Sequence, residues 1–140
     1  IAVADPALGV LLDGVGPSFS SGGDLDEFGS FPDPATAHAI RLTRSAARLL
    51  AHIGDRVEVR LHGSCLGAGI ELAAFAGRVI AHPETTMGLP EVPLGLVPGA
   101  GGTASLPLRV GRQRTALLAL TAEPIDPVTA LEWGLIDEIS

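Results

Sequence analysis

Two glutamates lie in apolar, glycine-rich stretches of this sequence, and their type and spacing could do chemistry. Glu71 is part of GAGIELAAF and Glu91 is part of GLPEVPLGL. A carboxylate removed from water is costly unless it is paired, hydrogen-bonded or neutralised, which makes both positions candidates for a site. Two carboxylates that flank one water molecule can act as a general base and a general acid. Each also has an ordinary interpretation: Glu71 as a solvent-facing acid near a helix N-terminus, and Glu91 as a solvated loop residue.

Two glycine-rich segments could supply backbone N–H groups to the same site. Small residues at 67–69 are expected to open a helix that runs to Ala76, with Gly77 as a left-handed cap. The free N–H groups of such a first turn attract negative charge. Gly22 and Gly23 permit unusual backbone angles and could expose another N–H in a bend. The alternatives are a close helix–strand contact at 67–69 and an ordinary glycine turn at 22–23.

The elements that must position these groups alternate between strands and helices. Hydrophobic patterning and turn residues predict strands over Leu8 to Val15, Val57 to Leu61, Arg78 to His82 and, as a strand or extended tail, Leu135 to Ile139. Further helices are expected from Pro34, capped by Asp33, to about Ile53; from Thr103 to near Gly111; over Arg112 to Thr121; and from Pro127 to Trp133. This alternation indicates an α/β fold with layered sheets.

The expected helix over residues 34–53 is amphipathic. Its apolar residues fall on one side, and Arg41, Arg44 and Arg48 fall on another. We expect the helix to cover the sheet. The simplest interpretation of the arginines is a solvated face, although one of them could reach a phosphate.

Composition narrows the possible functions. With 140 residues, 46% of them hydrophobic, the chain is long enough for one domain with a real core. Its net charge is -7 and every basic residue is arginine, so a nucleic-acid surface is not expected. Cys65 is the only cysteine, which fits a reducing compartment, and the histidines have no metal-ligand spacing. No apolar run reaches the length of a membrane span and no leader segment is evident, so we expect a soluble, cytoplasmic protein without a bound metal.

Several familiar motifs are excluded. A Walker loop needs a lysine, and the sequence has none. A dinucleotide fingerprint would need a glycine at the position of Leu72, and Ser64 lacks the flanking glycines of a nucleophile elbow. Two glycine-lined N–H sites and two carboxylates remain.

That combination resembles the crotonase superfamily, the enoyl-CoA hydratase/isomerase family. The resemblance covers nearly the whole chain and rests on FSSGGDL (19–25), HGSCLGAGIEL (62–72), MGLPEVPLGLVPGAGGT (87–103) and ALEWGLIDEI (130–139). It implies a crotonase-like ββα spiral, an α/β fold with layered sheets flanked by helices. Residues 1–140 would form the core domain, apparently lacking the family's N-terminal strand and helix and its C-terminal helical region.

The resemblance also implies roles for individual residues. Gly23 and Ala68 would supply the N–H groups of an oxyanion hole for a thioester carbonyl. Glu71 and Glu91 fall where hydratases keep two catalytic glutamates, and we assign Glu71 to water activation and Glu91 to protonation of the α-carbon. The implied substrate-binding residues are Ser21, Gly22, Asp24, Leu25, Gly67, Pro90 and Gly99. Many relatives carry a basic residue where this chain has Asp26, so contacts to the phosphates of coenzyme A (CoA) are not transferred.

The function implied is a 2-enoyl-CoA hydratase that needs no cofactor, because CoA is part of the substrate. Another crotonase reaction, such as isomerisation or thioester hydrolysis, and a non-catalytic scaffold that binds an acyl-CoA or a partner subunit are the alternatives. By the same resemblance we expect a homo-oligomer, a trimer or a dimer of trimers, with no nucleic-acid or membrane partner.

Overall fold

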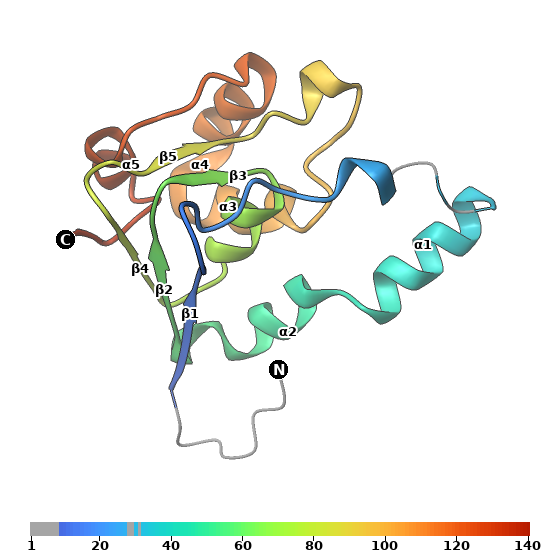
Figure 1. Cartoon of the computed structure of the whole chain (residues 1–140), viewed down its shortest axis with the longest axis horizontal. Helices are drawn as coiled ribbons and strands as arrows, with labels where there is room; N and C mark the ends of the chain where they lie inside the picture. The colour runs from blue at the N-terminus through green and yellow to red at the C-terminus, as the bar shows by residue number, and fades with distance from the viewer. Residues whose placement is uncertain (1–8, 28–29, 31) are drawn as a thin grey trace.

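A four-stranded parallel sheet forms the base of the fold. The computed structural model describes residues 9–27, 30 and 32–140. Within them, the strands β1 (Val10–Asp13), β2 (Val57–Leu61), β4 (Arg78–Ala81) and β6 (Glu138–Ile139) lie side by side in the order β1-β2-β4-β6 (Figure 1). The four predicted strands are confirmed within their expected ranges, except that Leu8 lies outside the described residues.

A second, two-stranded parallel sheet was not predicted. It pairs β3 (Ser64–Leu66) with β5 (Thr86–Gly88), and Ser20 extends it through an isolated bridge to Cys65. Each strand has only three residues, too few for an alternating pattern to show in the sequence. Pairing across the fold therefore creates these strands, and it brings residues 20–23 alongside residues 64–67.

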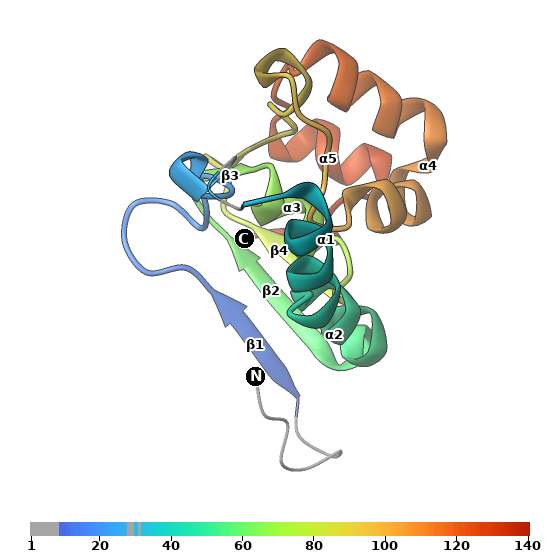
Figure 2. The same cartoon turned by 90° about the vertical axis from the view of Figure 1, so that its right-hand side faces the viewer.

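Helices connect and flank the strands. They are α1 (Pro34–Thr43), α2 (Ala46–Ile53), α3 (Ala68–Ala73), α4 (Gly102–Thr121) and α5 (Pro127–Trp133), with short 3₁₀ helices η1 (Leu25–Glu27), η2 (Gly54–Arg56) and η3 (Val92–Leu94). Figures 1 and 2 show α1 and α2 to one side of the four-stranded sheet, the side on which α3 also lies. None of the helices among the described residues is long and apolar enough to cross a membrane.

The single helix expected from Pro34 to about Ile53 is wrong, because the chain breaks at residues 44–45. Ser45 instead caps α2, its hydroxyl accepting a hydrogen bond of 3.3 Å from the N–H of Arg48. Serine favours caps over helix interiors because its side chain competes for backbone hydrogen bonds. The start of α1 is as predicted: Asp33 accepts from the N–H of Thr36 at 2.8 Å and Pro34 is the first helical residue.

Gly77 is not the left-handed cap that the sequence predicted. The helix α3 ends at Ala73, and Gly77 is not among the residues with positive φ. Glycine is required there because an added Cβ would lie 2.9 Å from the carbonyl oxygen of Gly54. Arg109 on α4 satisfies the free carbonyls after α3 by donating to those of Ala74 and Ala76.

The C-terminal helices follow the predicted boundaries. Gly111 has non-helical angles (φ 81°, ψ 163°), so α4 is two helical stretches that meet at this residue, as expected. Asp126 caps α5 by accepting from the N–H of Thr129 at 2.7 Å, and Gly134 ends it in the left-handed conformation.

The core lies between the four-stranded sheet and α3, α4 and α5. Its fully buried side chains include Val59 and Val79 from the sheet, Ile70 from α3 and Leu106 from α4. Because α3 is packed into this core on the side of its apolar residues, its first turn is held in a fixed position.

Candidate active site

Glu71 is buried although it is a carboxylate. Its side chain lies in the first turns of α3 and only 1% of the residue is exposed. Its Oε2 accepts a hydrogen bond of 2.6 Å from the backbone N–H of Gly102, the first residue of α4. Burial raises the pKa of Glu71 to about 7, the nearby charge of Glu91 adds to the rise, and the Gly102 N–H opposes it. The solvent-facing interpretation of Glu71 is therefore wrong.

Small residues bring the first turn of α3 close to the segment around Ser20. Gly67 precedes α3 with φ 52° and ψ −124°, a conformation that favours glycine, and its N–H donates to the carbonyl of Gly88 at 2.9 Å. A Cβ on Gly69 would lie 2.8 Å from Cβ of Ser20. The close contact considered from the sequence is thus present, and it is what places the two glycine-rich segments together.

Glu91 approaches the same place from the loop between β5 and η3. Its Oε2 is buried and has no hydrogen-bond partner among the described residues. Its Oε1 lies against Gly67, where an added Cβ would be only 2.6 Å away. A buried acceptor without a partner inside the chain is available to a ligand or to water.

Two backbone N–H groups are available next to the carboxylates. Ala68 is the first residue of α3, so its N–H has no acceptor within that helix. In the part of the chain that the structure describes, neither this N–H nor that of Gly23 donates a hydrogen bond to another protein group. Gly22 has the positive φ (106°) expected of the bend, whereas Gly23 does not.

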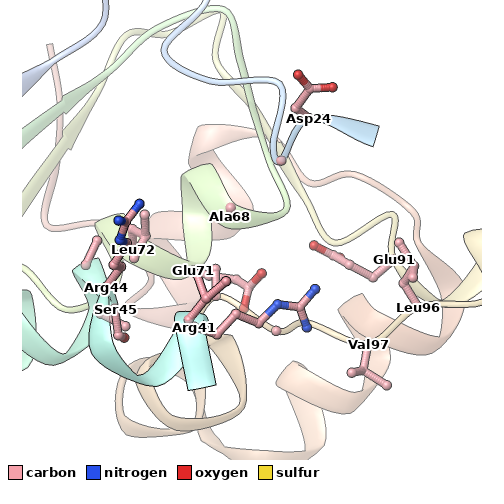
Figure 3. A pocket seen from close by; sticks show the side chains of 16 residues that line it. Asp24, Arg41, Arg44, Ser45, Ala68, Glu71, Leu72, Glu91, Leu96 and Val97 are labelled. Atoms are coloured by element: carbon pink, nitrogen blue, oxygen red, sulfur yellow. The ribbon is translucent and has the colours of Figure 1, made fainter. Parts of the chain in front are cut away.

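A cavity of about 420 Å³ joins these groups. Glu71, Glu91, Gly23 and Ala68 all line it, and Figure 3 shows the side chains of the two glutamates converging on it from α3 and from the loop after β5. This volume falls within the range of about 300–1,000 Å³ that is common for small-molecule sites. The arrangement can hold an oxyanion at the N–H groups and move protons at the carboxylates.

Of the other seven predicted site residues, two line the cavity and five do not. Asp24 and Gly99 line the cavity. Gly22 and Gly67 do not line it but lie close to each other, since a Cβ on Gly67 would be 3.8 Å from Cα of Gly22. Ser21, Leu25 and Pro90 do not line the cavity either.

The sequence missed several residues of the cavity wall. From α1 and its C-cap come Ile40, Arg41 and Arg44, and further apolar residues include Leu72, Leu96 and Val97. The arginine side of the amphipathic helix was the available signal, but helical periodicity alone does not show which neighbour a face meets.

The parallel α/β fold and the cavity with two carboxylates are those of a crotonase-type protein. The family model described as enoyl-CoA hydratase/isomerase matches residues 3–140. The chain therefore belongs to the enoyl-CoA hydratase/isomerase family.

Solved structures agree with this assignment. The chain is similar to the enoyl-CoA hydratase from Thermoplasma volcanium GSS1 (34% identity, TM-score 0.86, covering 98% of this chain and 55% of that one). It also resembles the enoyl-CoA hydratase from Bacillus anthracis (31% identity, TM-score 0.83, covering 95% of this chain and 52% of that one). A third similar structure is a putative enoyl-CoA hydratase from Thermobifida fusca YX in complex with CoA (32% identity, TM-score 0.81, covering 98% of this chain and 57% of that one). These matches confirm the predicted fold class. The chain spans a little over half the length of each of these structures.

Proposed function

We propose that this protein is a 2-enoyl-CoA hydratase. The observation that carries the proposal is that Glu71 and Glu91 line one cavity together with Gly23 and Ala68, whose N–H groups donate no hydrogen bond within the described part of the chain. Within the crotonase family, this set of groups suits the addition of water to a conjugated thioester. A CoA thioester as substrate is further supported by the similar Thermobifida fusca protein, which was solved in complex with CoA.

The two N–H groups would hold the thioester carbonyl oxygen. When water adds to a conjugated thioester, negative charge develops on this oxygen. Fixed donors aimed at the charge each contribute a few kcal/mol in a site that excludes water. The N–H of Ala68 also gains from its place at the N-terminus of α3.

The two carboxylates would move the protons. Glu71, ionised, takes a proton from water as the water oxygen bonds to the β-carbon, while the carbon–carbon double bond shifts its electrons towards the thioester. Glu91, which must carry a proton at this step, then gives it to the α-carbon, so that one water has been added in all. The proton held by Glu71 must afterwards pass to Glu91, which restores both carboxyl groups for the next turnover. A pKa of about 7 lets Glu71 exchange a proton at neutral pH.

The proposal requires no cofactor beyond the CoA of the substrate. It also includes assembly as a homo-oligomer, a trimer or a dimer of trimers.

Hydration is tested with trans-2-butenoyl-CoA. We expect the absorbance of the conjugated thioester to fall and a product to form with the mass of one added water. Unchanged absorbance together with CoA binding would instead indicate a scaffold. Release of free CoA thiol would indicate a hydrolase, and a moved double bond without added water would indicate an isomerase.

A further inference from the structure

Two arginines line the cavity that holds the proposed reaction centre. Arg41 lies in the last turn of α1 and Arg44 is its C-cap, so they are three positions apart on the helix side that borders the cavity. They belong to the arginine side that the sequence suggested was simply solvated. A hydrocarbon acyl chain has no hydrogen-bond acceptor for a guanidinium group. Two arginines in the cavity wall are therefore not explained by binding of such a chain.

Arg41 is the arginine closer to the chemistry. Figure 3 shows its side chain extending from α1 towards the space that Glu71 and Glu91 face, whereas Arg44 turns towards Leu72. Arg41 remains exposed to solvent and already interacts within the chain. A guanidinium group has five N–H donors, so an interaction within the chain leaves donors for a ligand.

The ligand group that suits this position is a carboxylate on the acyl chain. A planar guanidinium pairs with a carboxylate through two parallel hydrogen bonds. The phosphates of CoA are a poorer match, because the long pantetheine arm separates them from the thioester, whereas Arg41 extends towards the space that Glu71 and Glu91 face. Three acidic residues line the cavity, and all come from elements other than α1: Glu71 from α3, Glu91 from the loop after β5 and Asp24 from the segment before η1.

We propose that Arg41 makes the site selective for acyl-CoA thioesters whose acyl chain ends in a carboxylate. This inference rests on the proposed function, since it assumes that the cavity holds the acyl group of a thioester. Arg41 would then be a specificity-determining residue: it would bind the distal carboxylate while the thioester carbonyl lies at the N–H groups of Gly23 and Ala68.

Binding of saturated thioesters tests this inference without requiring turnover. Isothermal titration calorimetry would compare 4-carboxybutanoyl-CoA with its methyl ester, which has the same chain without the charge. We expect the wild-type protein to bind the acid about 10-fold or more tightly than the ester, the range of a charge-assisted pair. Arg41→Ala should remove this preference and leave the Kd of the ester unchanged, and Arg41→Lys should restore part of it.

A matched control is Arg48→Ala. Arg48 is an exposed arginine on the neighbouring helix α2 and does not line this cavity, so this variant should keep the wild-type preference. Circular dichroism would confirm that each variant is folded.

Three results would overturn the inference. They are equal affinity of the wild-type protein for acid and ester, an equal loss of affinity for acid, ester and free CoA in Arg41→Ala, and no binding of any acyl-CoA. The second would assign Arg41 to the phosphates of CoA. A preference for the acid in a protein that does not hydrate 4-carboxybut-2-enoyl-CoA would support the inference while contradicting the proposed hydratase function.

Discussion

The backbone N–H of Gly102 donates a 2.6 Å hydrogen bond to Oε2 of Glu71, so the first residue of α4 fixes a carboxylate that projects from α3. The two helices also pack closely there, and the hydroxyl of Ser105 donates to the carbonyl of Glu71 at 2.7 Å. The orientation of Glu71 therefore depends on a contact between two segments that are distant in sequence.

Gly102→Ala should displace the Glu71 carboxylate. A Cβ at residue 102 would lie 2.5 Å from Cγ and 2.8 Å from Oε2 of Glu71, which is too close for both to keep their positions. We expect kcat for hydration to fall by about 100-fold, the size of loss that a misplaced catalytic group can cause. Gly9→Ala is the control, because its Cβ would meet nothing closer than 3.7 Å. Wild-type kcat in Gly102→Ala would mean that the position of Glu71 does not matter.

Glu71→Gln and Glu91→Gln should each abolish most hydration. Both changes keep the size of the side chain and remove its ability to exchange a proton, so we expect kcat to fall by about 10²–10⁴-fold. Thermal melts should show that both variants fold. Glu84→Gln changes an exposed glutamate elsewhere and should retain wild-type rates. If either active-site variant hydrates 2-butenoyl-CoA at close to the wild-type rate, the role assigned to that glutamate is wrong.

Local signals in the sequence predicted much of the fold. Some helix boundaries depend only on residues close to them in sequence, and these boundaries were predicted correctly. Examples are the caps at Asp33 and Asp126 and the glycine breaks at 111 and 134. The break at Ser45 was missed because the amphipathic pattern continues across it, and β3 and β5 were missed because three-residue strands depend on their partners.

The candidate site was predictable in its composition but not in its surroundings. The two glutamates could be identified because a carboxylate in an apolar stretch is costly to bury, and the glycine-rich segments because such runs of small residues are unusual. The cavity wall from α1, including Arg41, could not be predicted, because it depends on how α1 is oriented relative to α3. Nor does any local pattern link Gly102 to Glu71, since the hydrogen bond joins separate helices.

Ala68→Pro should remove one proposed oxyanion donor while keeping the fold. Residue 68 is the first of α3, a position where proline is well tolerated, as Pro34 and Pro127 show in α1 and α5. The preceding Gly67 is not in the helical conformation that a following proline disfavours. We expect kcat to fall by about 10²–10³-fold, as when other enzymes lose such a donor.

The control for this variant is Ala68→Gly. It keeps the N–H, so its kcat should remain within a few-fold of the wild-type value. Circular dichroism should give the same spectrum for both variants. Equal activity of Ala68→Pro and Ala68→Gly would remove the Ala68 N–H from the mechanism.

Hydration should lose rate as the pH falls below about 7. If Glu71 is the base, it must be ionised, and burial raises its pKa to about 7. We therefore expect kcat/KM to decrease on the acid side with an apparent pKa in this region. A rate that stays constant down to pH 5 would contradict this role.

Burial of Glu71 also predicts how stability depends on pH. Its pKa is raised from an ordinary 4.5 to about 7 in the folded protein, so folding favours the protonated acid. This contribution is fully present below pH 4.5 and is lost as the pH rises through about 7. The pKa difference corresponds to about 3 kcal/mol. The free energy of unfolding can be measured by urea titration at pH 4–8. As the pH rises, that of the wild type should fall by about 3 kcal/mol relative to that of Glu71→Gln. Subtracting the two curves cancels the titration of distant groups, and a difference independent of pH would mean that Glu71 titrates like an exposed acid.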